Sequence, residues 1–191
     1  MKKIYIILFI LAMTFSISNG QFTKLGGGVG FTTGFPFQLQ TGDAYKSEHF
    51  DASVKGIYEL NQPIYISGSF TYFMPHITKD IEGKTTVSSL MFDMNGQYIF
   101  NSLDRFEFYG LAGIDILLAW KKDTFTGFPA STESDNALGL NIGAGTCMKI
   151  TEQLDLYIEA KYILSKYHQV MLNAGVLINL GWLKKNENKG N

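Results

Sequence analysis

The sequence is poor in cysteine and in charged residues. One cysteine among 191 residues cannot form an intrachain disulfide framework, and it excludes a cysteine-rich zinc or iron–sulfur site. Charged residues make up 17% of the chain, below the average of roughly 25% for soluble domains. The formal net charge of −1 provides no basic surface for nucleic acid, so we expect no nucleic-acid partner.

Long apolar runs are also scarce, because the sequence has only one, at its N-terminus. Lys2 and Lys3 precede the apolar residues 4–15, and small residues follow up to Gly20. This arrangement predicts a signal peptide over residues 1–20 that is cleaved on export. After Gly20 no apolar run reaches the roughly 20 residues that a spanning helix requires. A membrane-inserted form of the remaining chain would therefore have to be a closed β-barrel.

Glycine and aromatic residues are plentiful, and apolar residues alternate with polar ones along the chain. Alternation of this kind predicts β-strands. It occurs in eight stretches, at residues 24–35, 50–60, 64–74, 87–100, 106–120, 136–150, 154–165 and 169–182. These stretches are longer than typical soluble strands of about 5–6 residues. They are long enough for tilted membrane strands, which need about 9–11 residues.

The predicted connections alternate between short and long. Short ones lie at residues 61–63, 101–105 and 151–153, and long polar ones at residues 36–49, 75–86 and 121–135. An even number of strands, with short turns at one end and long loops at the other, is typical of outer-membrane barrels. We predict an all-β fold, an eight-stranded antiparallel up-and-down transmembrane β-barrel over residues 21–182, followed by a polar tail over residues 183–191.

Alternation alone does not say which face points inward. A soluble exported barrel would turn its apolar face toward a bound ligand. We favour an apolar face toward lipid, because the polar face is rich in glycine, asparagine, serine and glutamine. Aromatic residues also gather near the strand ends, as Trp120 and Tyr98 do, which is typical of membrane girdles.

The export signal, the eight strands and a last strand that ends on Trp182 resemble the small OmpA/OmpX-type outer-membrane β-barrel proteins. The resemblance covers residues 21–182. In that family the assembly signal ends the chain on an aromatic residue, usually phenylalanine, whereas here nine residues follow Trp182. The resemblance implies an outer-membrane location, with lipid, lipopolysaccharide and the outer-membrane assembly machinery as partners. We expect the barrel to be a monomer.

Eight strands enclose a lumen that is just wide enough for side chains to fill. The alternation places a set of polar side chains inside near mid-height: Lys55, Asp93, Asn95, Asp115, Asn141, Glu159, Lys161 and Asn173. They could form an ion path or proton relay, or a packed structural network. We favour the packed network, because buried charges must be paired.

No catalytic, cofactor-binding or metal site is predicted. A lipid A deacylase needs a nucleophile beside a base, and the three histidines His49, His76 and His168 all lie near the predicted outer end. A His-x-Ser pairing would require serine two residues after His168, where the chain has Val170. Our leading hypothesis is a non-enzymatic outer-membrane protein that contributes to envelope integrity or surface interaction. A small-solute, porin-like channel and a lipid A-modifying enzyme are the alternatives.

Overall fold

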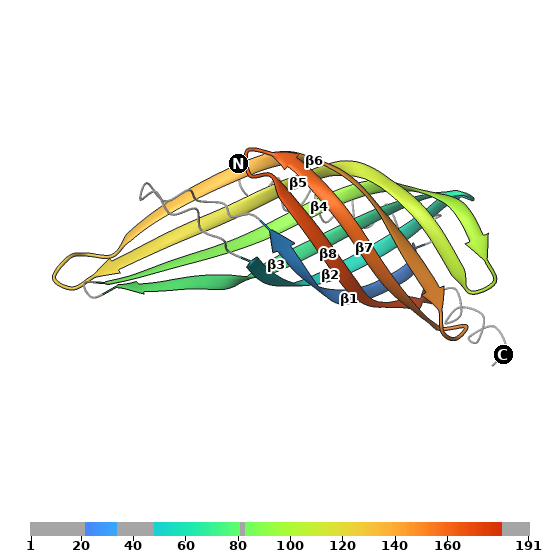
Figure 1. Cartoon of the computed structure of the whole chain (residues 1–191), viewed down its shortest axis with the longest axis horizontal. Helices are drawn as coiled ribbons and strands as arrows, with labels where there is room; N and C mark the ends of the chain where they lie inside the picture. The colour runs from blue at the N-terminus through green and yellow to red at the C-terminus, as the bar shows by residue number, and fades with distance from the viewer. Residues whose placement is uncertain (1–21, 34–47, 81–82, 181–191) are drawn as a thin grey trace, which may run out of the picture.

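The computed structural model describes residues 22–33, 48–80 and 83–180, and these residues form a closed antiparallel barrel (Figure 1). Each strand pairs with the next along the chain, and β8 closes the ring on β1. The strands are β1 Phe22–Thr33, β2 Glu48–Asn61, β3 Ile64–Asp80, β4 Gly83–Leu103, β5 Phe106–Phe125, β6 Ser131–Lys149, β7 Leu154–Ser165 and β8 Gln169–Asn179. The predicted eight-stranded up-and-down barrel is confirmed. Among the described residues, no helix is long and apolar enough to cross a membrane.

The outer face of the barrel is an apolar belt. Large apolar side chains that point outward include Val29, Met94, Leu140 and Ile158, with 59–66% of their surface exposed. The same strands turn their polar side chains inward, as the alternation of exposed and buried residues along β7 shows. This is the reverse of a soluble ligand-binding barrel, which would bury its apolar face.

The strands differ in length, and the difference is concentrated at one end. Strands β3 to β6 contain 17–21 residues, whereas β1, β2, β7 and β8 contain 11–14. Figure 1 shows the β3–β4 and β5–β6 hairpins reaching beyond the other strands. We call residues 74–80, 83–88, 121–125 and 131–136 together the sheet extension.

Two of the predicted long loops are wrong in their extent, because the sheet extension occupies much of them. Residues 75–86 and 121–135 are largely paired strand, because β3 and β4 pair as far as Asp80 and Gly83. Likewise β5 and β6 pair as far as Asp123 and Ser131. Glycine, proline and acidic residues disfavour strands in general, but here backbone pairing onto long neighbours extends the hairpins.

At the opposite end the connections are short turns, as at Gln62 and Pro63 between β2 and β3. The predicted connection at residues 101–105 is shorter still, because β4 continues to Leu103 and β5 begins at Phe106. The predicted signal peptide (1–20), most of the first long loop (36–47) and the C-terminal tail (183–191) lie outside the described residues.

Candidate functional site

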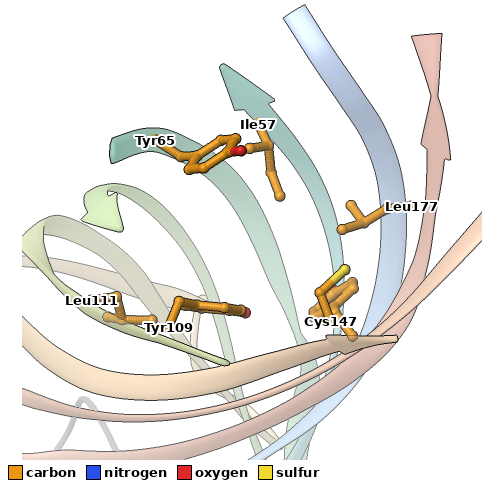
Figure 2. Close-up of a cluster of buried hydrophobic side chains, with 7 residues drawn as sticks. Ile57, Tyr65, Tyr109, Leu111, Cys147 and Leu177 are labelled. Carbon is orange, nitrogen blue, oxygen red and sulfur yellow. The ribbon is translucent and has the colours of Figure 1, made fainter. Parts of the chain in front are cut away.

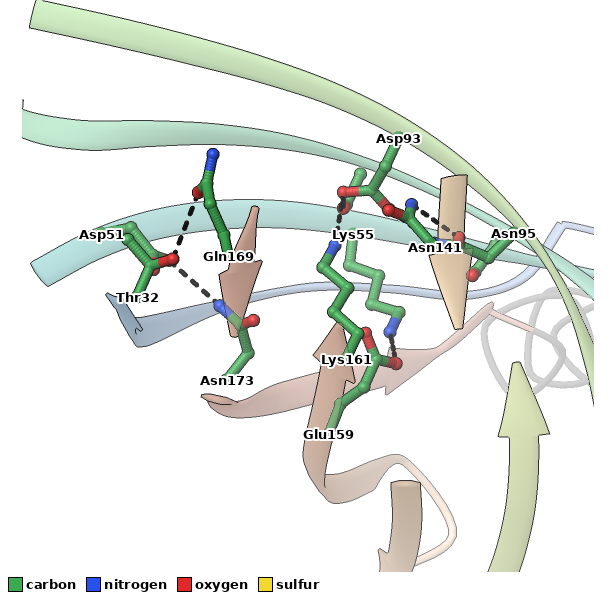
Figure 3. A network of polar contacts seen from close by, with 12 residues as sticks. Thr32, Asp51, Lys55, Asp93, Asn95, Asn141, Glu159, Lys161, Gln169 and Asn173 are labelled. Atoms are coloured by element: carbon green, nitrogen blue, oxygen red, sulfur yellow. Dashed lines mark hydrogen bonds and ion pairs between the residues drawn. The ribbon is translucent and has the colours of Figure 1, made fainter. Parts of the chain in front are cut away.

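The barrel lumen holds all the polar residues that the alternation placed at mid-height. Their side chains are buried, with 1–7% of their surface exposed: Lys55, Asp93, Asn95, Asp115, Asn141, Glu159, Lys161 and Asn173. Strand register puts several of them side by side, since Ser69 on β3, Asp93 on β4 and Asp115 on β5 pair in one row. Hydrogen bonds and ion pairs join seven of these eight residues, all but Asp115, into three groups (Figure 3).

The first group surrounds Asp93. Lys161 Nζ lies 2.8 Å from Asp93 Oδ2, and Ser69 Oγ donates to the same oxygen at 2.7 Å. Asn95 Nδ2 donates to Asp93 Oδ1 at 2.6 Å, and Asn141 Nδ2 donates to Asn95 Oδ1 at 2.9 Å. The carboxylate of Asp93 is therefore fully engaged by a cation and two neutral donors, as a buried charge requires.

The second group surrounds Glu159. Lys55 forms an ion pair with Glu159 Oε2, and Tyr109 Oη donates to that oxygen at 2.9 Å. The ammonium of Lys55 also lies 5.0 Å from the centre of the Tyr157 ring, within the range of a cation–π interaction. Both charged side chains are about 5% exposed or less, so the pair is shielded from solvent.

The third group includes residues that the sequence analysis did not single out. Asn173 Nδ2 donates to Asp51 Oδ1 at 3.0 Å, and Thr32 Oγ1 donates to Gln169 Oε1 at 3.3 Å. Asp51, Thr32 and Gln169 are all at most 3% exposed. They share the inward parity of their strands, so alternation alone could have identified them.

Apolar side chains fill the lumen on both sides of these polar groups. Four successive inward residues of β7 are Tyr157, Glu159, Lys161 and Ile163. The two charged residues, Glu159 and Lys161, therefore lie between an aromatic and an aliphatic neighbour. Toward the short turns lies the turn-end cluster, made of Ile57, Tyr65, Tyr109, Leu111, Cys147, Tyr157 and Leu177 (Figure 2). Toward the extension lies the loop-end cluster, made of Phe73, Met91, Leu117, Ala137, Ile163 and Met171.

The two apolar clusters were not predicted, although the sequence carries a signal for them. Pairs of neighbouring apolar residues interrupt the alternation at Leu117-Leu118, Met171-Leu172 and Leu177-Ile178. In each pair one residue is exposed on the belt or partly so, and the other is at most 2% exposed inside. Such pairs mark strand segments that are apolar on both faces.

A further charged group lies beyond the turn-end cluster. Lys24 Nζ is 2.8 Å from Asp155 Oδ2 and 3.6 Å from Glu107 Oε2. Lys149 Nζ approaches Glu107 Oε1 at 3.2 Å. These pairs line the turn end of the lumen, where side chains are more exposed than at mid-height.

The sheet extension has its own polar contacts outside the belt. Thr85 Oγ1 on β4 donates to Asp123 Oδ1 on β5 at 2.7 Å, and Lys121 Nζ lies 3.1 Å from Asp123 Oδ2. Burial raises the pKa of Asp123, but the hydrogen bonds from Thr85 and Lys121 outweigh it and hold the pKa below its usual value. These contacts fasten two strands of the extension to each other.

Two of the three histidines have described side chains. His168 follows β7 and stacks on Tyr162, with ring centres 6.3 Å apart, and His76 lies on β3 in the extension. The side chain of His49 is outside the described part of the chain. No group of three or more potential metal ligands occurs in the residues that the structure describes.

A small cavity lies in the lumen at mid-height. The cavity there has a volume of about 10 Å³ and is lined by Ser53, Lys55, Ser69, Thr71, Tyr157, Glu159, Lys161 and Asn173. A cavity of that size holds about one water molecule. The geometry therefore suits a packed polar core better than a passage for solutes.

A closed ring of long strands with an apolar belt and a filled polar lumen defines a small transmembrane β-barrel. The model of one family, the outer membrane protein beta-barrel domain, matches residues 7–182, and the chain belongs to this family. The family places the protein in the outer membrane. No curated protein matches the chain in sequence.

Solved structures share the fold at low identity. Neisserial surface protein A is 16% identical, with a TM-score of 0.61 over 85% of this chain and 99% of that one. Ail of Yersinia pestis is 16% identical, with a TM-score of 0.57 over 83% and 99% of the two chains. The N-terminal barrel of Pseudomonas aeruginosa OprF is 17% identical, with a TM-score of 0.50 over 84% and 99%. These are small outer-membrane barrels, and the likeness shows the fold.

Proposed function

We propose that this protein is a non-enzymatic outer-membrane barrel that displays the sheet extension at the cell surface, where it supports envelope integrity or surface interaction. The observation that carries the proposal is the continuation of β3, β4, β5 and β6 beyond the other four strands. The outward face becomes more polar there. Ser88 and Ser134 lie directly opposite Trp120, and Lys122 follows, whereas Leu118 on the barrel side is apolar; Ile77 on β3 is an exposed apolar residue within the extension. The extension therefore lies outside the apolar belt.

Two strand edges of the extension support an interaction role. Strand β3 pairs with β2 only as far as Phe73, and β6 pairs with β7 only from Gly139 onward. Among the described residues, no strand covers the outer edge of residues 74–80 or of residues 131–138. Uncovered edges can pair with an extended segment of another chain. An extended peptide of a surface partner is the class of ligand that fits.

The lumen is proposed to be a structural core and not a pore. Both of its mid-height lysines are paired with carboxylates, and apolar clusters lie on both sides of the polar network. We also propose a monomer that reaches the outer membrane through a cleaved signal peptide and the assembly machinery, with lipid and lipopolysaccharide around the belt. Ail has been crystallised with sucrose octasulfate, a heparin analogue. Here Lys121 of the sheet extension is engaged by Asp123 and Glu133, so this lysine is not free for such a ligand.

Trimming one hairpin tests the display role. Replacing residues 122–132 by an Asn-Gly turn closes the strands at the Lys121–Glu133 pair and leaves the barrel below unchanged. The control variant replaces residues 126–130, which lie outside the paired strands, by glycine and serine at equal length. We expect the trimmed variant to keep its heat-modifiable gel mobility but to lose surface adhesion or envelope resistance to detergent, while the control retains both. Equal adhesion and equal resistance in all three proteins would contradict the proposal.

Two further measurements separate the alternatives. Planar-bilayer recordings of the purified protein should show no stable, large single-channel steps, and such steps would support the pore. Mass spectrometry of lipid A from expressing cells should show unchanged acyl chains, and altered chains would support a lipid A-modifying enzyme.

A further inference from the structure

The buried charges around the polar network of the lumen do not balance. The carboxyl groups there belong to Asp51, Asp93, Asp115 and Glu159, and the cations to Lys55 and Lys161. Each lysine has one carboxylate partner, Lys55 with Glu159 and Lys161 with Asp93. Asp51 and Asp115 have no ion pair, and one carboxyl oxygen of each, Oδ2, is buried without a hydrogen-bond partner. An isolated ionised carboxylate is very costly to bury.

Asp93 and Asp115 offer a direct comparison, because they face the lumen opposite each other on β4 and β5. Like charges directly opposite on neighbouring strands destabilise a sheet. Asp93 receives three hydrogen bonds, including one from Lys161, whereas Asp115 Oδ2 receives none. Asp115 is nevertheless only 2% exposed, so solvent does not replace the missing partner.

A second unpartnered acceptor lies beside Asp115. Asn141 on β6 pairs with Gly113, two residues before Asp115, so its side chain is a diagonal neighbour on the same face. Its amide nitrogen already donates to Asn95, and its Oδ1 is buried without a partner. Gly139, directly opposite Asp115, leaves room for the carboxyl: a Cβ at that position would lie 2.3 Å from Asp115 Oδ2. Two neighbouring positions on the lumen face thus each carry a buried acceptor that lacks a donor.

We propose that Asp115 is a proton-binding site of the lumen, which takes up one proton from solvent when the barrel forms and donates its O–H to Asn141 Oδ1. A protonated carboxyl has one donor, whereas an ionised one has none. The charged groups that face Asp115 are Lys161 from β7 and Asp93 from β4, and β6 contributes the uncharged Gly139 and Asn141. Lys161 is already engaged by Asp93, so it does not neutralise a second carboxylate. This inference does not depend on the proposed surface role.

Infrared spectroscopy of the refolded barrel tests the proton directly. At mildly acidic pH, the wild-type protein should show the carbonyl band of a protonated carboxyl, and part of this band should be lost in Asp115→Asn. The matched control is Asp104→Asn, because Asp104 is exposed in the β4–β5 turn and should contribute nothing to the band. An unchanged band in Asp115→Asn would overturn the proposal.

The second readout is the thermal unfolding temperature measured across a range of pH, with heat-modifiable gel mobility as the signal for the folded barrel. A proton bound only in the folded barrel makes stability fall as pH rises through the range in which the proton is lost. Asp115→Asn should keep the fold and remove part of that fall, since its amide can donate to Asn141 Oδ1 at any pH. Asp93→Asn should lower the unfolding temperature at every pH, because Lys161 loses its partner. Equal pH dependence in wild type and Asp115→Asn would refute the proposal, as would stability that depends on sodium concentration, since sodium would then be the ligand.

Discussion

Removing the cation from the Lys55–Glu159 pair should strongly destabilise the barrel. Lys55→Met leaves Glu159 buried with a single hydrogen bond, from Tyr109. Breaking a buried pair by removing one partner costs about 3–5 kcal/mol. We expect about 3 kcal/mol, at the lower end, because a hydrogen bond to a charged group retains part of the stabilisation. The cost arises from the uncompensated charge and not from lost packing, since methionine is similar in length to lysine.

A double-mutant cycle distinguishes these two causes. Glu159→Gln should also destabilise, because it leaves Lys55 buried without an acceptor of opposite charge. The double variant, Lys55→Met with Glu159→Gln, removes both charges, and replacing a whole buried pair is often nearly neutral. We expect the double variant to be more stable than either single variant by at least about 2 kcal/mol.

The free energy of unfolding can be measured by urea titration of the barrel in lipid vesicles, with tryptophan fluorescence as the signal. The sequence has two tryptophans, and Trp120 lies at the edge of the belt beside the sheet extension. Heat-modifiable mobility confirms that each variant starts from the folded state. Additive effects of the two single substitutions, or single costs below about 1 kcal/mol, would show that the pair is solvated and that the lumen is not a packed core.

Three further predictions concern the barrel wall and its outer end. Gly26→Ala should impair refolding, because a Cβ there would lie 1.8 Å from a carbonyl oxygen of β8. Gly68→Ala should be tolerated, because the nearest atom to a Cβ there is 3.9 Å away. The folded fraction on unheated gels measures the effect of both substitutions. Ile116→Arg on the belt should cost about 2–4 kcal/mol in vesicle unfolding, and Thr124→Arg in the extension close to nothing; equal costs would refute the placement of the belt. The lowered pKa of Asp123 means that its hydrogen bonds persist at neutral pH and are lost as pH falls through that lowered value. Amide signals of the β5–β6 hairpin in nuclear magnetic resonance spectra should therefore shift on acidification, and Asp123→Asn should remove that step.

The barrel itself could be predicted from sequence because one physical constraint acts along every strand. Lipid on one side and a crowded lumen on the other impose a period of two, and residues such as Asp93, Met94 and Asn95 follow it without exception. Eight such stretches, with turn residues between them, leave a closed ring as the arrangement that satisfies all backbone groups in a membrane.

The extent of the hairpins could not be predicted in this way. Beyond the belt, the outward face of the strands meets water and not lipid, so the apolar alternation weakens, and residues such as Pro75, Gly83 and Asp123 are typical of loops. Backbone pairing with a long neighbour keeps Gly83 and Asp123 in strands, whereas Pro75 lies in a bulge of β3 between Phe73 and His76. The partners of lumen side chains could not be predicted for another reason. Parity indicates that Lys161 points inward, but β7 and β4 are not paired strands, and only the contact across the lumen shows that Lys161 reaches Asp93.

The pairing of β5 with β6 up to Asp123 and Ser131 has a consequence for how this protein can vary. Residues between that last pair can be added, lost or exchanged without shifting any side chain below from one face to the other, because the register is already set. Insertion or deletion of a single residue within a membrane-spanning strand would instead move every following side chain of that strand to the opposite face. The sequence of the hairpin tip can therefore vary independently of the stability of the membrane-spanning strands. The tip at residues 126–130 is a position where a foreign epitope can be inserted at little cost to folding.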